Sequence, residues 1–176
     1  MSAGHRKTDL QCASAAIVAL GSNLGDSCAN LREATQRLEQ LADGGFRSSS
    51  LWQSTPVDCP PGSPLFVNAV VAFKPAAGET PESLLVRLQV LEKEFGRQSK
   101  IVLNEPRPLD LDLITFGTEV RSTPHLTLPH PRAHQRRFVL EPLNEIAPEL
   151  VLPRQNRSIR QLLAELHTDE VLHRIP

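Results

Sequence analysis

Two aspartates separated by one residue are the part of this sequence best suited to metal-dependent chemistry. Residues 109–116 alternate in side-chain character, which predicts a β-strand. In a strand, Asp110 and Asp112 project from one face, with their backbones about 7 Å apart. Carboxylates at this spacing can share one ion or bracket two, and Mg²⁺ prefers oxygen ligands together with phosphate oxygens and water. The pair predicts a magnesium site, but an edge strand with a solvated acidic face would show the same pattern.

Basic residues lie in the segment just before these aspartates. Arg97, Lys100 and Arg107 give this short stretch of a nearly neutral chain a local positive charge. The guanidinium group of arginine pairs with phosphate oxygens and stabilises the charge that builds during phosphoryl transfer. The mixture therefore fits a magnesium-nucleotide site, and weak surface salt bridges between the same residues are an equally simple explanation.

Length, composition and charge narrow the protein class. The chain has 176 residues, of which 40% are hydrophobic and 22% charged, which is typical of one globular domain. Its net charge of -1 lacks the positive excess of nucleic-acid-binding proteins, so we expect no nucleic-acid partner. The apolar run 13–20 is far shorter than the ~20 residues of a membrane span, so we expect no membrane association. Three cysteines at wide spacings, Cys12, Cys28 and Cys59, fit a reducing cytoplasm better than a disulfide framework.

The element order predicts an α+β protein. Strands are expected at 15–20, 46–53, 65–73 and 109–116. One helix follows a cap at Asp26 or Ser27, and another follows the cap at Thr80. Apolar residues at helical spacing predict the buried faces of these helices: Leu31, Ala34, Leu38 and Leu41 in the first, and Leu84, Leu88, Leu91 and Phe95 in the second.

Strand, helix, strand, strand, helix, strand is the ferredoxin-like order, in which an antiparallel sheet carries two helices on one face. Residues after the fourth strand are expected to add helical segments such as 158–166. The proline-rich loop 54–62 is stiff and suits the wall of a binding pocket. We predict a single domain over residues 15–176, preceded by a polar and mobile extension at 1–14.

Five separated motifs lie along the chain, and they are the segments 19–24 (ALGSNL), 66–70 (FVNAV), 104–114 (NEPRPLDLDLI), 128–131 (LPHP) and 142–148 (PLNEIAP). In type and order they resemble the motifs of the 6-hydroxymethyl-7,8-dihydropterin pyrophosphokinase family of folate biosynthesis. The resemblance covers roughly residues 15–165. The resemblance independently implies the ferredoxin-like fold.

The resemblance implies transfer of pyrophosphate from ATP to the hydroxymethyl oxygen of the pterin, with release of AMP and the use of two Mg²⁺ ions. It assigns Asp110 and Asp112 as metal ligands and Arg97 and Arg107 as phosphate-binding arginines, and we expect these four residues to be the catalytic set. Other matches to the family's ATP site are Glu92, Leu113, Thr127, His130 and Arg136. Positioning and charge stabilisation would then supply most of the catalysis.

The resemblance also implies a pterin pocket. Phe66 and Phe138 match the two residues that stack on the flat ring, and Asn68 can read its polar edge because an amide both donates and accepts. The remaining expected contacts are Gly21, Ser54, Thr55, Pro56, Val57 and Asp110. Taken without the family, the two phenylalanines are simply buried core residues and Asn68 is a turn former.

Departures from the family leave several points open. Asn104 and Ser99 replace a tryptophan and a basic residue of some members, which affects the expected ATP affinity. His125 replaces a frequent arginine, and Phe66 lacks the hydroxyl of a tyrosine. His130 and His134 have the spacing of a helical metal pair, but prolines on both sides of His130 make a zinc site a poor hypothesis.

Two other functions compete with this assignment. The first is a ferredoxin-like module that binds a metal-nucleotide without turnover. The second, a two-metal nuclease, is disfavoured because the chain lacks a broad basic surface. We expect a monomer or weak dimer, and the sequence does not say whether the natural protein is joined to another folate enzyme.

Overall fold

The computed structural model describes residues 14–57, 59, 61–97 and 105–176. None of the helices in these ranges is long and apolar enough to cross a membrane. The elements in chain order are β1 (Ala16–Ser22), α1 (Ser27–Glu39), β2 (Arg47–Ser48), β3 (Trp52–Ser54), β4 (Phe66–Phe73), α2 (Pro81–Glu94), β5 (Asp110–Phe116), β6 (Arg121–Ser122), β7 (Thr127–Leu128), a 3-10 helix (Ala133–Gln135), α3 (Arg137–Ile146), α4 (Ile159–Glu165) and β8 (Leu172–Arg174).

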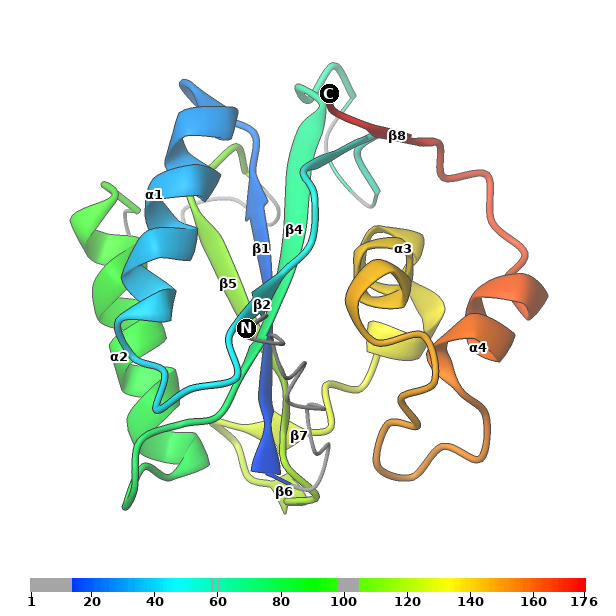
Figure 1. Cartoon of the computed structure of the whole chain (residues 1–176). Coiled ribbons are helices and arrows are strands. Elements are labelled where there is room, and N and C mark those ends of the chain that lie inside the picture. The colour runs from blue at the N-terminus through cyan, green and yellow to red at the C-terminus, as the bar shows by residue number, and fades with distance from the viewer. Residues whose placement is uncertain (1–13, 58, 60, 98–104) are drawn as a thin grey trace, which may run out of the picture.

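The main sheet confirms the predicted ferredoxin-like core. Its strands lie in the order β5-β1-β4-β3-β8, β2 also pairs with β4, and every pairing is antiparallel. Helices α1 and α2 cover one face of this sheet (Figure 1), and most of the predicted apolar stripe residues are buried against it. The predicted caps are also confirmed, because Asp26 Oδ1 accepts a hydrogen bond from Ala29 N and Thr80 Oγ1 accepts one from Ser83 N.

The other face of the sheet is covered as well, which the core order alone did not predict. Helices α3 and α4 lie on this side (Figure 1), where Val139, Leu140 and Leu143 of α3 pack against Ile17 and Val70 of the sheet. Helix α4 confirms the expected helical segment at 158–166. Helix α3 contains Pro142, a residue that weakens a helical pattern in sequence, and it forms because its apolar side is buried. The site described below therefore lies between a sheet face and α3.

The strand predicted at 46–53 is wrong as a continuous element. It is divided into β2 and β3, both paired with β4. At the break, Ser49 N donates to Val70 O while Ser49 Oγ accepts from Val70 N, so a hydroxyl takes the place of a backbone acceptor. Ser50 N turns away and donates to Glu145 Oε2 of α3. The break ties the sheet edge to α3.

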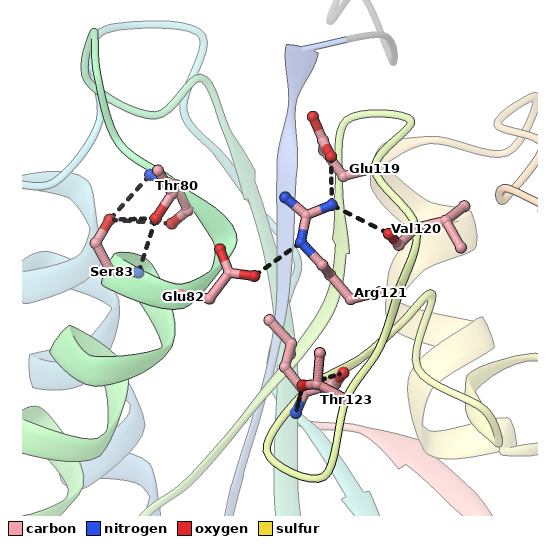
Figure 2. A network of polar contacts seen from close by, with 8 residues as sticks. Thr80, Glu82, Ser83, Glu119, Val120, Arg121 and Thr123 are labelled. Carbon is pink, nitrogen blue, oxygen red and sulfur yellow. Dashed lines mark hydrogen bonds and ion pairs between the residues drawn. The ribbon is translucent and has the colours of Figure 1, made fainter.

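A short hairpin made by β6 and β7 follows β5 and is attached to the start of α2 (Figure 2). Arg121 Nε donates to Glu82 Oε1 at 2.7 Å, and its Nη1 donates to Glu119 Oε2 at 2.6 Å. Exposed ion pairs are individually weak, but the pair with Glu82 links the hairpin to the helix that lies beside β5. The hairpin leads directly into His130, whose backbone N–H donates to Ile114 O of β5 at 2.8 Å.

Candidate active site

Three neighbouring strands place Asp110, Gly21 and Asn68 side by side. Asp110 of β5 pairs with Gly21 of β1, which pairs in turn with Asn68 of β4. Directly paired residues of an antiparallel sheet project from the same face. Asp112 lies two residues further along β5, opposite Ala19, and so projects from this face too. The predicted metal ligands and the predicted pterin-reading amide therefore share the sheet face covered by α3.

Gly21 forms the floor between these side chains. A Cβ atom placed on it would lie 3.6 Å from Asn68 Oδ1, 3.8 Å from Phe66 Cδ1 and 4.0 Å from Asp110 Cβ. These are ordinary van der Waals distances, so glycine here leaves open space at the point where the three side chains converge. The amide of Asn68 is fixed in orientation, because Nδ2 donates to Ser54 Oγ at 2.8 Å and to Trp52 O at 3.4 Å.

The turn after β1 anchors the basic segment that precedes β5. Asn23 N donates to Arg107 O, and Asn23 Oδ1 accepts from Arg107 N at 2.9 Å. Asn30 of α1 adds a hydrogen bond to Pro108 O. This pairing explains why the segment 21–23 and the segment before Asp110 both belong to the site although they are far apart in sequence.

Arginines surround both aspartates. Arg97 Nη1 lies 2.6 Å from Asp110 Oδ1, and Arg107 Nη2 lies 3.0 Å from Asp110 Oδ2. Arg136 Nη1 lies 3.8 Å from Asp112 Oδ2. The Nε of Arg107 is buried and has no acceptor among the described residues. The arrangement is suited to a bound polyphosphate.

The aspartates themselves fit a divalent cation. Burial, and then the charge of Asp110, raise the pKa of Asp112 above its ordinary value. A bound cation relieves this repulsion between neighbouring carboxylates. Within the described ranges no group of three or more His, Cys, Asp and Glu side chains is arranged to hold a metal. In nucleotide sites Mg²⁺ is commonly bound by one or two carboxylates, and phosphate oxygens and water complete its coordination.

Glu92 supports this cluster from α2. Its Oε1 accepts a hydrogen bond from Leu111 N at 2.7 Å, on the outer edge of β5, and it also contacts Arg97 Nη1. Burial raises the pKa of Glu92 to about 7, against the opposing effects of the Leu111 hydrogen bond and the Arg97 charge. Glu92 therefore orients Arg97 and fixes the edge strand that carries the aspartates.

We expect Glu92→Gln to change how stability depends on pH. A carboxyl group whose pKa is raised on folding stabilises the protein below its unfolded pKa, and this contribution is lost as pH rises through the folded value of about 7. Glutamine keeps an oxygen for Leu111 N but does not titrate. Between about pH 5 and about pH 8, the melting temperature of the variant relative to wild type should rise by about 3 °C in EDTA. If the melting temperatures of the two proteins changed with pH in parallel, Glu92 would be excluded as a source of the pH dependence of stability.

Two cavities meet at the aspartates. The first combines apolar and polar walls, and it is lined by Ala19, Leu20, Gly21, Ser54, Thr55, Val57, Cys59, Phe66, Asn68, Arg107, Asp110, Asp112, Arg132, Arg136 and Phe138. It thus brings together most of the residues predicted to bind the pterin. Each phenylalanine is accompanied by an arginine, since the guanidinium of Arg107 lies 5.6 Å from the Phe66 ring centre and that of Arg136 lies 5.4 Å from the Phe138 ring centre.

The second cavity is mostly polar. Its lining residues are Leu85, Gln89, Glu92, Arg97, Arg107, Asp110, Leu111, Asp112, His130, Arg132 and Arg136. His130 Nδ1 accepts a hydrogen bond from Arg132 N at 3.2 Å, which leaves Nε2 as the protonated nitrogen of the neutral ring. Burial lowers the pKa of His130, with nearby Arg136 and Arg132 acting in the same direction. A neutral His130 can donate one hydrogen bond to a phosphate oxygen.

Three predicted contacts do not line either cavity. Leu113 is buried in the core beneath α1 and α2, on the opposite side of β5 from Asp112. Thr127 is exposed on β7, and Pro56 lies in the loop after β3. Their roles stay predictions. Lys100, Ser99 and Asn104 lie outside the described residues, as does nearly all of the predicted extension at 1–14.

Arg132 is a site residue that the sequence reasoning missed. It lines both cavities together with Arg107, Asp110, Asp112 and Arg136. Its neighbours His130 and His134 lie on a loop and on the 3-10 helix, and not on one continuous helix. The signal that was available was the local repetition of basic residues at 130–137, which only the fold brings against the aspartates.

Comparison with known proteins shows the family to which the chain is similar. Residues 17–148 match the family model described as 7,8-dihydro-6-hydroxymethylpterin-pyrophosphokinase. A Haemophilus influenzae protein named 2-amino-4-hydroxy-6-hydroxymethyldihydropteridine pyrophosphokinase is 38% identical, over 86% of this chain and 89% of the relative. A Synechocystis protein of the same name is 37% identical, over 86% of this chain and 75% of the relative.

Longer proteins are also similar to this chain. The Pneumocystis carinii folic acid synthesis protein fol1 is 33% identical over 92% of this chain, which spans 21% of that protein. The crystal structure of Plasmodium falciparum HPPK-DHPS with pteroate superposes with a TM-score of 0.68 at 15% identity, over 86% of this chain and 44% of that one. The second likeness supports the fold alone. By the family match and these relatives, the chain belongs to the 7,8-dihydro-6-hydroxymethylpterin-pyrophosphokinase family.

Proposed function

We propose that this protein transfers pyrophosphate from MgATP to the hydroxymethyl oxygen of 6-hydroxymethyl-7,8-dihydropterin and releases AMP. The observation that carries the proposal is the junction of the two cavities. A polar, arginine-rich cavity that suits a triphosphate meets a cavity with aromatic and amide walls that suits a flat heterocycle. The residues common to both are Arg107, Asp110, Asp112, Arg132 and Arg136. The β-phosphorus of ATP, held at this junction, would face the hydroxymethyl group of the pterin.

The first cavity would bind and orient the pterin. Phe66 and Phe138 offer ring faces for stacking, and the fixed amide of Asn68 presents its oxygen beside Gly21 as an acceptor for a ring N–H. Gly21 itself allows the ring to approach the sheet closely. Ser54, Thr55 and Val57 complete the wall on the β3 side. Held in this way, the hydroxymethyl group would point toward the aspartates.

The second cavity would hold the triphosphate. Arg97, Arg107 and Arg136 would stabilise its charge, and His130 would donate to a phosphate oxygen. In the reaction, the hydroxymethyl oxygen forms a bond to the β-phosphorus as the bond from that phosphorus to the AMP oxygen breaks, and the hydroxyl proton is released to water. Fixed orientation of the two reactants and charge stabilisation then lower the barrier.

Asp110 and Asp112 would hold Mg²⁺, of which we propose two ions. The metal would supply neutralisation of the triphosphate and orientation of its reacting phosphorus. Arg97 and Arg107 would leave Asp110 at least in part when the metal binds, and their guanidinium groups would then turn to phosphate oxygens.

The identity of the nucleotide product tests the proposal. Purified protein with Mg²⁺, ATP and 6-hydroxymethyl-7,8-dihydropterin should form AMP in proportion to pterin pyrophosphate, and omission of the pterin should stop AMP formation. Formation of ADP would show ordinary kinase chemistry and overturn the assignment. Tight nucleotide binding by well-folded protein without pterin-dependent turnover would instead favour a binding module.

Replacement of Arg132 tests whether the junction of the two cavities holds the transferred phosphate. We expect Arg132→Ala to lower kcat/KM for AMP formation by about 10- to 100-fold, because a cation beside the transferred group stabilises its developing charge. Arg160→Ala is the matched control, since Arg160 of α4 forms an exposed ion pair with Glu149. Equal activity of the two variants would remove Arg132 from the phosphate site.

Location and assembly are further parts of the proposal. We propose action in the reducing cytoplasm, which fits the absence of a disulfide at Cys28 and Cys59, the cysteines that the structure describes. We propose action as a monomer or weak dimer. Sedimentation at micromolar concentration would test the assembly state.

A further inference from the structure

The N-terminus of α3 carries two residues of the site but lacks a cap of its own. Arg136 precedes the first helical residue and Phe138 is the second, and both line the first cavity. Arg136 makes no side-chain capping hydrogen bond, so it leaves the first N–H groups of α3 to other partners. Unless those groups are satisfied, the first turn of a helix frays. The placement of the Phe138 ring therefore depends on a group from elsewhere in the chain.

Glu170 supplies that group. Its Oε2 accepts from Arg137 N at 3.0 Å and its Oε1 accepts from Phe138 N at 3.2 Å, so one carboxylate satisfies two successive N–H groups of α3. A negative charge at this end also interacts favourably with the helix dipole. Glu170 is buried, with 7% of its surface exposed, and Thr168 Oγ1 accepts from its backbone N–H. It lies beyond residues 17–148, which match the family model.

The same segment is attached to the opposite wall of the pocket. Val171 N donates to Thr55 Oγ1 at 3.3 Å, and Thr55 N donates to Val171 O at 3.2 Å. Immediately afterwards β8 pairs with β3, with Leu172 opposite Ser54. Figure 1 shows this C-terminal segment (red) running from α4 past α3 to the edge of the sheet. The segment thus connects the β3 wall, which carries Ser54 and Thr55, to the α3 wall, which carries Phe138.

We infer that Glu170 is a positioning residue for the pterin pocket, which fixes the first turn of α3 and, through Val171 and Thr55, sets its separation from the β3 wall. The inference rests on the proposed function for the identity of the ligand. Most residues of the nucleotide cavity come from α2, β5 and the segments beside them, whereas the side chain of Glu170 accepts hydrogen bonds from the first turn of α3. Loss of Glu170 should therefore affect the pterin more than ATP.

Steady-state kinetics on the full chain test this difference. Glu170→Ala should raise KM for the pterin by about 10-fold, a change typical of a lost helix cap, while KM for ATP changes by less than about 3-fold. The pterin KM of Glu170→Gln should fall between the values of the alanine variant and wild type. The amide oxygen of glutamine still accepts a hydrogen bond from one N–H, but it carries no charge. Asp169→Ala, at the adjacent exposed position, is the matched control and should behave as wild type.

The outcomes separate the inference from the proposed function. Absence of pterin-dependent AMP formation in wild type would overturn the proposed function and with it the pterin as ligand. Active wild type with an unchanged pterin KM in Glu170→Ala, or with equal increases for pterin and ATP, would overturn the positioning role. If the alanine variant does not fold, the glutamine variant decides by the same ratio of the two KM values. A wild-type ratio in that variant would also overturn the role.

Discussion

Replacement of Asp112 by asparagine should lower the rate of AMP formation by about 1,000-fold while the protein remains folded. Asparagine has nearly the same size but cannot supply a charged oxygen to Mg²⁺ or balance the arginines around the triphosphate. The aspartate is also costly to the metal-free fold, because burial and the neighbouring Asp110 charge disfavour its ionised form. We therefore expect the inactive variant to melt at a slightly higher temperature than wild type in EDTA.

Asp110→Asn should cause a loss at least as large. Asp110 contacts both Arg97 and Arg107 in the metal-free protein, so its replacement removes a metal ligand and also the group that holds these two arginines beside the site before the metal binds. Asp43→Asn is a suitable control for both variants, because Asp43 forms an exposed ion pair with Lys74. Turnover within tenfold of wild type at saturating Mg²⁺ and substrates, in either variant, would rule out a ligand role for that aspartate.

Asn68→Leu should lower kcat/KM for the pterin by about 100- to 1,000-fold, with little change in ATP binding. Leucine conserves the approximate volume but presents no polar atom to the edge of the heterocycle. In wild type the amide is buried and its nitrogen is engaged by Ser54 Oγ and Trp52 O, so its oxygen faces the cavity in a fixed orientation. A polar ligand edge left without its partner in a buried site loses much more affinity than an apolar contact does.

Titrations of activity with the pterin and with ATP together distinguish a role of Asn68 in pterin binding from a role in supporting the sheet. Asn156→Leu makes the same chemical change at an exposed position before α4 and should retain wild-type kinetics. A parallel loss of ATP affinity in Asn68→Leu would indicate that the residue mainly supports the sheet. Unchanged pterin kinetics would contradict the proposed orientation of the ring against Gly21.

Local sequence signals were sufficient for β1, β4, β5 and the first two helices. The caps at Asp26 and Thr80, the apolar spacing in α1 and α2, and the alternation around Asp110 all depend on residues within a few positions of each other. The same reasoning failed at 46–53, where Ser49 Oγ, in place of a backbone carbonyl, accepts the hydrogen bond from Val70 N of β4. This use of a side chain as the acceptor depends on a partner 21 residues away, and no local sequence pattern predicts it.

Helix α3 was missed for a related reason. Pro142 interrupts its local signal, and its stability comes from the sheet face against which Val139, Leu140 and Leu143 are buried. The resemblance named Arg136 and Phe138 as site residues without indicating which element carries them. Their position opposite Phe66 and Asn68 follows only once α3 lies on that face of the sheet.

Asp110 and Asp112 show how the two kinds of information divide. The sequence by itself determined that both carboxylates project from one face of a strand, because side chains alternate with a period of two residues, and its motifs indicated the family. Only the tertiary structure decided how the rest of the site is built: Glu92 bonds to the edge of β5, Arg132 lies at the junction of the two cavities, and Glu170 binds the start of α3. These contacts join segments distant in the chain, since burial of both sheet faces brings them together, and that proximity has no signature in local spacing.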